Sequence, residues 1–92
     1  MRSWNNDYRW ESGNHTNFPA PTVDSVYLVI RKGERFRIGM NKFECVGIHY
    51  SGGFIVSYGI LNHTTMVAKW VGSDAISKAF EERDVVWLSP VR

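Results

Sequence analysis

The chain has 92 residues and a formal net charge of +2, with 22% charged and 43% hydrophobic residues. This length allows one domain, and this composition excludes an intrinsically disordered chain. Four Trp, four Tyr and five Phe are many for this length. A domain so small buries only somewhat over half of its unfolded surface, so we expect a core dense in these large side chains.

Cys45 is the single cysteine of the sequence, which excludes a disulfide within the chain and suits a reducing compartment. The first residues lack the apolar stretch of a signal peptide. Every apolar run is shorter than the roughly 20 residues that span a bilayer. We therefore expect a protein of the cytoplasm of the producing or infected cell, without membrane contact.

Residues 1–25 form a polar N-terminal arm rich in Asn, Ser, Thr and Gly. Pro19 and Pro21 restrict the backbone, so the end of the arm is neither a helix nor a central strand. Three large aromatic side chains lie in the arm: Trp4, Tyr8 and Trp10. Either the arm docks these side chains on the domain, or it becomes ordered on a partner with the three residues as anchors.

Residues 26–92 form the domain, which consists mainly of short strands. Runs of β-branched and aromatic residues, separated by turn residues, predict strands at 26–31, 35–38, 43–50, 54–61, 66–71 and 85–88. In the second of these, Phe36 and Ile38 face inward, and Arg35 and Arg37 face outward.

Glycines indicate how the strands are joined and bent. Ser51-Gly52-Gly53 is the strongest hairpin signal, because paired glycines supply the positive φ of a tight turn. Gly47 and Gly59 lie inside strands, where glycine often marks a bulge or a bend. We predict a mainly β fold: a small bent antiparallel sheet or barrel of five to six strands, with one short C-terminal helix.

The helix is expected at about 74–83. Ser73 or Asp74 can cap its N-terminus, and Asp74 suits the positive end of the helix dipole. We expect it to pack on the sheet through Ile76 and Phe80. Ala75 and Ala79 share that apolar face, whereas Lys78, Glu81 and Glu82 face solvent.

About 55 residues of this pattern resemble an SH3-like small β-barrel. The resemblance lies in the runs 33–38, 43–48 and 52–56. The helix and final strand at 73–88 are similar to the endings of SH3-like domains in phage and mobile-element proteins. The resemblance implies a module that binds peptides, nucleic acids or proteins, and it selects none of these.

Residues for metal binding or catalysis are sparse. Cys45 and His49 share a strand face, but four residues of strand span about 13 Å, too far for a common zinc ion or a nucleophile–base pair. His15 and His63 are the other two residues considered as possible metal ligands. Glu81, Glu82 and Asp84 fit a solvated helix end. We therefore expect no metal, no cofactor and no enzymatic activity.

The positive charge is concentrated in one segment. Residues 26–50 carry five bases and two acids, whereas residues 1–25 and 51–92 sum to −1 and 0. Arg35 and Arg37 project from one side of a strand, about 7 Å apart, close to the phosphate spacing of an extended nucleic-acid strand. The five bases form a nucleic-acid site, a surface for an acidic protein or a solvated outer face: Arg31, Lys32, Arg35, Arg37 and Lys42.

Three functions follow from these observations. The first is a non-enzymatic binding module that grips DNA or RNA through the basic hairpin. The second is a viral, phage-type inhibitor or interaction protein that blocks a host protein through the aromatic arm and a sheet edge. The third is sequestration of a nucleotide by the same arginines, across a homodimer.

Overall fold

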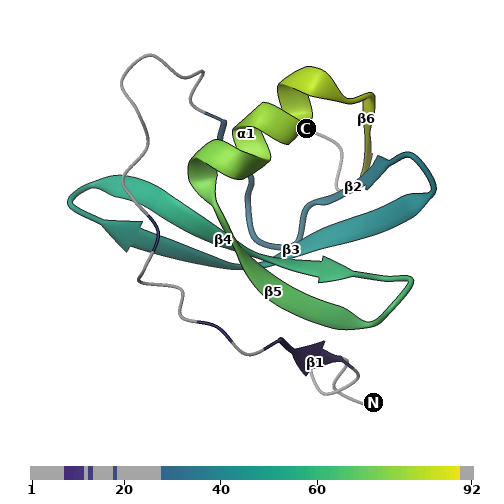
Figure 1. Ribbon diagram of the computed structural model, residues 1–92, viewed down its shortest axis with the longest axis horizontal. Helices are drawn as coiled ribbons and strands as arrows, with labels where there is room; N and C mark the ends of the chain where they lie inside the picture. The colour runs from purple at the N-terminus through teal and green to yellow at the C-terminus, as the bar shows by residue number, and fades with distance from the viewer. Residues whose placement is uncertain (1–7, 12, 14–17, 19–27, 90–92) are drawn as a thin grey trace.

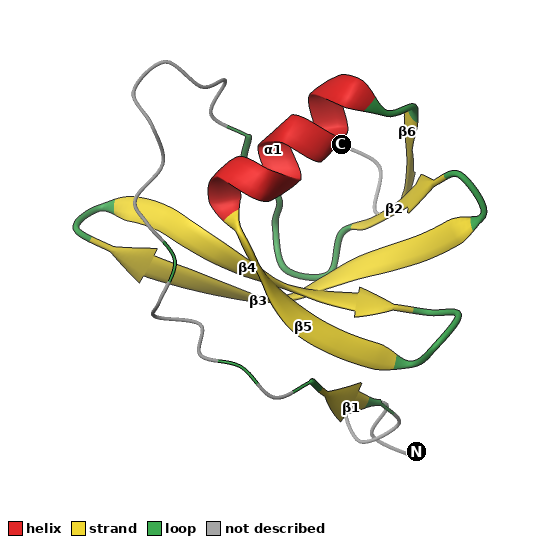
Figure 2. Ribbon diagram, in the orientation of Figure 1, coloured by secondary structure: helices red, strands yellow, loops and turns green. Residues whose placement is uncertain are grey.

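The structure is a computed structural model that describes residues 8–11, 13, 18 and 28–89. The described residues form a mainly β domain with one helix (Figures 1 and 2). The strands are β1 (Arg9–Trp10), β2 (Arg35–Ile38), β3 (Asn41–Ser51), β4 (Phe54–Asn62), β5 (Val67–Gly72) and β6 (Val85–Ser89), and the helix α1 spans Ser73–Glu82.

The strands form one six-stranded sheet in the order β1-β5-β4-β3-β2-β6. Every neighbouring pair is antiparallel except β1 and β5, which are parallel. The predicted mainly β fold with one short helix is therefore confirmed. The sheet is mixed and not wholly antiparallel, because a piece of the N-terminal arm adds the short strand β1 at its edge.

The long strand β3 bends the sheet around α1 (Figure 1). Its first residues pair with β2, and residues 43–51 pair with β4. The β3–β4 register shifts between Cys45 and Gly47 and again between His49 and Tyr50. Such bulges bend a strand and increase its twist, so the bend predicted at Gly47 is confirmed.

The turn between β3 and β4 is also as predicted. Gly52 and Gly53 have φ angles of 59° and 82°. Side chains with a Cβ atom rarely adopt this left-handed region, and two such residues in succession suit a two-residue hairpin turn.

The core lies between the sheet and α1, and an aromatic cluster joins its layers. The ring centroid of Phe36 on β2 lies 5.5 Å from that of Phe43, 4.9 Å from that of Phe80 and 5.8 Å from that of Trp87. Ile76 of α1 is buried in the same core. The predicted packing of the helix through Ile76 and Phe80 is confirmed.

The start of α1 differs from the prediction. The N-cap is Gly72, the helix begins at Ser73, and the cap makes no side-chain hydrogen bond. The buried side chains of α1 are Ser73, Ile76 and Ser77, whereas Ala75 is exposed. The cap prediction and the inward placement of Ala75 are therefore wrong. The helix follows directly on β5, and packing of Ser73, Ile76 and Ser77 sets the rotation of the helix about its axis. Asp74 is an acidic residue in the first turn of the helix, as predicted.

The strand predicted at 26–31 is wrong over residues 28–31, which form no strand, while 26 and 27 lie outside the described residues. The fully buried Tyr58 explains this. Its hydroxyl donates to the Leu28 carbonyl at 2.8 Å and accepts from the Ile30 N–H at 3.2 Å. One side chain thus satisfies the backbone groups that a strand would otherwise pair.

Tyr58→Phe tests this interaction. The substitution leaves the Leu28 carbonyl and the buried Ile30 N–H without the hydroxyl, so we expect the free energy of unfolding to fall by about 2 kcal/mol. Urea denaturation measures the change. The matched control is Tyr50→Phe, since Tyr50 is 61% exposed and should change stability by less than about 0.5 kcal/mol. Equal losses in the two variants would contradict the assignment.

Candidate functional site

The outer face of the β2–β3 hairpin carries three of the five predicted basic residues. Phe36 and Phe43 are register partners that pack in the core, so the side chains next to them in each strand point to the opposite face. There Arg35 pairs with Glu44 and Arg37 with Lys42. The outward orientation predicted for Arg35 and Arg37 is consistent with this register.

The pairing of Arg37 with Lys42 is unusual for a folded sheet. Both side chains are exposed, and they stand directly opposite each other on neighbouring strands. Like charges in this arrangement are destabilising, because cross-strand partners have Cβ atoms only about 5 Å apart. An anion between the two side chains would remove the repulsion.

Glu44 partly balances this charge. It is 8% exposed, and its Oε1 lies 3.3 Å from Arg35 Nε and 2.9 Å from His63 Nε2. The turn that holds His63 is fixed to β3, since the His63 N–H donates to the Lys42 carbonyl at 2.8 Å. No local pattern in the sequence indicates this contact of His63, because it joins residues 19 positions apart.

A hollow of about 440 Å³ lies beside this cluster. We call it the basic hollow. It is lined by Arg35, Lys42, Phe43, His63 and Leu88. Two predicted basic residues and a histidine thus line the same hollow as two apolar side chains, a combination that suits an anionic ligand with an apolar part.

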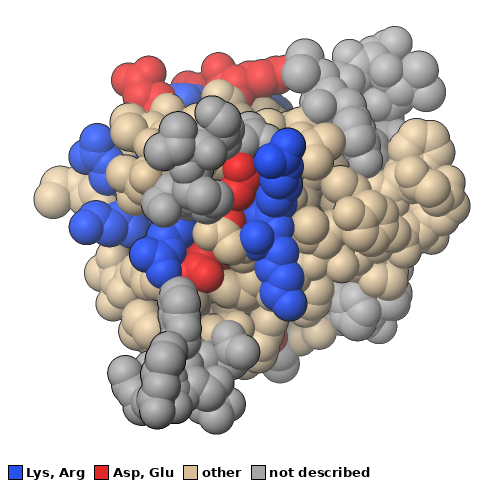
Figure 3. All heavy atoms as spheres, turned by 180° about the vertical axis from the view of Figure 1, so that it is seen from behind, with Lys and Arg blue, Asp and Glu red and all other residues tan. Residues whose placement is uncertain are grey.

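The other two predicted basic residues lie before β2. Arg31 and Lys32 are exposed, in a segment that is tied to β3. The Gly33 N–H donates to the Cys45 carbonyl at 2.7 Å, and the Cys45 N–H donates to the Glu34 carbonyl at 2.9 Å. The same segment of the chain also carries two buried acidic residues, Glu34 and Glu44. Figure 3, which shows the molecule from behind, shows Lys and Arg side chains with acidic side chains between them.

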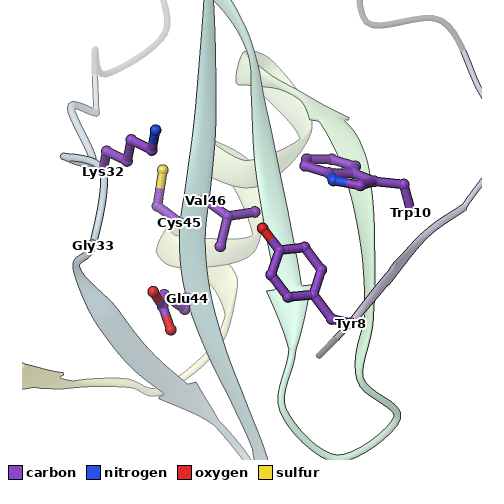
Figure 4. A pocket seen from close by; sticks show the side chains of 7 residues that line it. All are labelled: Tyr8, Trp10, Lys32, Gly33, Glu44, Cys45 and Val46. Carbon is purple, nitrogen blue, oxygen red and sulfur yellow. The ribbon is translucent and has the colours of Figure 1, made fainter. Parts of the chain in front are cut away.

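Lys32 lines a second hollow, also of about 440 Å³, which we call the aromatic hollow. Figure 4 shows Tyr8 and Trp10 of the arm on one side of it and Lys32 on the other. Its lining residues are Tyr8, Trp10, Lys32, Gly33, Glu44, Cys45 and Val46. Burial, with a further contribution from the charge of Glu44, raises the pKa of the Tyr8 hydroxyl.

Two glycines allow Trp10 to occupy this position. Gly47 and Gly59 are register partners on β3 and β4. A Cβ atom on Gly59 would lie 2.7 Å from Trp10 Cη2, and one on Gly47 would lie 2.8 Å from Trp70 Cη2. The two indole rings stack with centroids 5.2 Å apart and planes 19° apart. Tyr8 meets Trp10 edge to face at 6.1 Å. Of the three predicted anchors, Tyr8 and Trp10 thus contact the domain or each other, and Trp4 lies outside the described residues.

The residues considered for metal binding or catalysis do not come together. Among the described residues, no three His, Cys, Asp or Glu side chains could hold a metal ion. His15 lies outside them, and His49 is half-buried on β3 opposite Ser57. Cys45 is fully buried, and burial raises the pKa of its thiol to about 11. The described part of the chain also has no helix that is long and apolar enough to cross a membrane.

Comparison with protein-family models finds no match, and comparisons with curated proteins and with solved structures find none that is significant. The resemblance to SH3-like domains and the inferred phage origin therefore depend on the strand and turn pattern alone. The sheet itself is compatible with a β-barrel-like fold.

Gly59→Ala tests whether the two glycines are needed for Trp10 of the arm to pack on the sheet. The new methyl group would overlap Trp10 and displace its ring, which we expect to cost about 1–3 kcal/mol of unfolding free energy. It should also abolish the exciton signal of the stacked indoles in circular dichroism. Gly13→Ala is the control, since a Cβ atom there meets nothing within 4 Å. An unchanged exciton signal in Gly59→Ala would show that the indoles do not need this space.

The buried thiol predicts a loss of stability in alkali. Since the pKa of Cys45 is raised from 9.0 to about 11 in the folded protein, its contribution is fully present below about pH 9 and is lost as the pH rises through about 11. Urea denaturation between about pH 8 and about pH 11 should show a fall of roughly 2–3 kcal/mol from this group. Cys45→Ala should fall less over this range, and a parallel fall in both proteins would exclude the thiol as the cause.

Proposed function

We propose that this protein is a non-enzymatic binding module of SH3-like type that holds nucleic acid on its β2–β3 hairpin. The observation that carries the proposal is the exposed like-charge pair Arg37–Lys42 beside the basic hollow. Arg binds phosphate through a two-pronged guanidinium, and Lys binds it as a point charge. A phosphate between the two strands would thus turn an unfavourable pair into a favourable one.

The distribution of charge supports the same face. From Val46 to Ala68 the chain contains no Asp, Glu, Lys or Arg. Most of β3, all of β4 and the hairpin between them are therefore uncharged. Between residues 26 and 68, all Lys and Arg residues lie in the segment 31–42. A polyanion approaching the molecule would be attracted to the β2–β3 hairpin more strongly than to the β3–β4 hairpin.

Glu44 limits how strongly the site binds. Because its carboxylate contacts Arg35 and His63, fewer cations are left to neutralise phosphates than the sequence alone suggests. We expect about three phosphate contacts, and therefore a slope of about −2 when the logarithm of the binding constant for a single strand is plotted against that of salt concentration. Contacts of this kind position a nucleic acid without reading its sequence.

Charge reversal on the hairpin tests the proposal. Fluorescence anisotropy with labelled DNA and RNA strands of mixed sequence measures affinity at several salt concentrations. We expect Arg37→Glu combined with Lys42→Glu to weaken binding about tenfold or more and to reduce the magnitude of the salt slope by about 1.4, because two phosphate contacts are lost.

The matched control reverses two charges elsewhere. Lys69 of β5 and Lys78 of α1 are exposed and line neither the basic nor the aromatic hollow. Lys69→Glu with Lys78→Glu changes the net charge by the same amount and should retain affinity within about threefold. Equal losses in both double variants would show that net charge matters and that the hairpin is not the binding site.

A further inference from the structure

We propose that the aromatic hollow receives one unpaired base of the bound strand, so that the protein selects single-stranded over double-stranded nucleic acid. This inference rests on the proposed function. It concerns a second site, built largely from the arm, that contributes base contacts beside the phosphate contacts of the hairpin.

The aromatic side chains of the hollow are held in place before any ligand binds. Trp10 stacks on Trp70 and lies over Gly59, yet it remains 43% exposed. Tyr8 packs edge to face on Trp10 and is half-buried. Aromatic side chains that bind bases contribute to affinity whatever the base, because every base has a π face. A rigid ring loses little conformational freedom on binding, which strengthens the contact.

The polar groups of the hollow suit the edge of a base. Lys32 supplies donors and Glu44 supplies acceptors. Glu44 contacts Arg35 and His63 through one oxygen, Oε1, and a carboxylate has about four lone-pair positions on its two oxygens. Base edges present donors and acceptors side by side, so a mixed pair of this kind complements them better than a uniformly basic pocket would. A hollow of about 440 Å³ also lies within the usual range of small-ligand sites, about 300–1,000 Å³.

Glu44 connects the aromatic hollow with the basic residues. It lines the aromatic hollow, and its carboxylate contacts Arg35 and His63, which line the basic hollow. A strand whose phosphates lie along the hairpin can therefore turn a base into the aromatic hollow without leaving the protein. A duplex cannot do so unless it pays the cost of unpairing and unstacking that base.

Three probes of equal length test this inference: a mixed-sequence single strand, the same strand with abasic residues, and the duplex. All are measured by anisotropy on the full chain. The abasic strand keeps the phosphates, so it should bind about fivefold or more weakly than the complete strand if bases are contacted. The duplex should also bind more weakly than the complete strand.

Variants assign the base contact to the hollow. Trp10→Leu should lower affinity for the complete strand to that for the abasic strand and leave the abasic affinity unchanged, whereas Trp10→Phe should retain part of the difference. Tyr50→Leu is the control, because Tyr50 is an exposed aromatic residue at the β3–β4 hairpin, away from both hollows.

The outcomes separate the two proposals. If the unmodified protein binds the abasic and complete strands equally, the base site is wrong and the phosphate-binding hairpin stands. If it binds none of the probes, both proposals fail. The comparison of abasic and complete strands uses the unmodified chain, so it decides the question even if Trp10→Leu does not fold.

Discussion

Two indole rings can lie against this sheet only because Gly47 and Gly59 face each other on neighbouring strands. Any side chain at either position would meet a ring carbon at less than 3 Å, closer than van der Waals contact allows. With that space available, Trp70 covers one glycine and Trp10 covers the other. The sheet thereby fixes Trp10, and through it Tyr8, at one wall of the aromatic hollow. The pairing of β1 with β5 and the proposed base site both depend on this contact.

A second constraint is the burial of carboxylates among the basic residues. Glu34 is 1% exposed and Glu44 is 8% exposed, and buried charges require partners. Glu34 accepts from the Arg31 N–H at 2.6 Å, and Glu44 contacts Arg35 and His63. These interactions shape the turn before β2 and draw the 62–66 turn against the hairpin. They also place two carboxylates close in sequence to the five bases of residues 31–42.

Local signals in the sequence predicted most of the fold. Alternation in Arg35–Ile38 and the Gly52-Gly53 turn follow from short-range backbone rules, and both are present in the structure. Contacts between distant residues were not predictable in the same way. The Tyr58 hydroxyl replaces a strand partner for residues 28 and 30 positions away, and glycines read as bend points also proved to be places where indoles pack. The sequence therefore indicated the basic residues of the candidate site, but not its buried glutamates or its hollows.

The exposed pair Arg37–Lys42 is best understood through its place in the sheet. β2 pairs with β3 on one side and β6 on the other, and the β6 partner of Arg37 is Val86, which is 43% exposed and carries no charge. Neither neighbouring strand thus places an acid directly opposite Arg37, although Glu44 lies opposite Arg35 two register pairs away. The bases of the sheet are thus of two kinds. Some lie beside a buried carboxylate, whereas Arg37 and Lys42 lie opposite each other. The first group stabilises the fold. The second group costs stability as long as no anion lies between the two side chains, and this cost is the physical reason for proposing the hairpin as a binding surface.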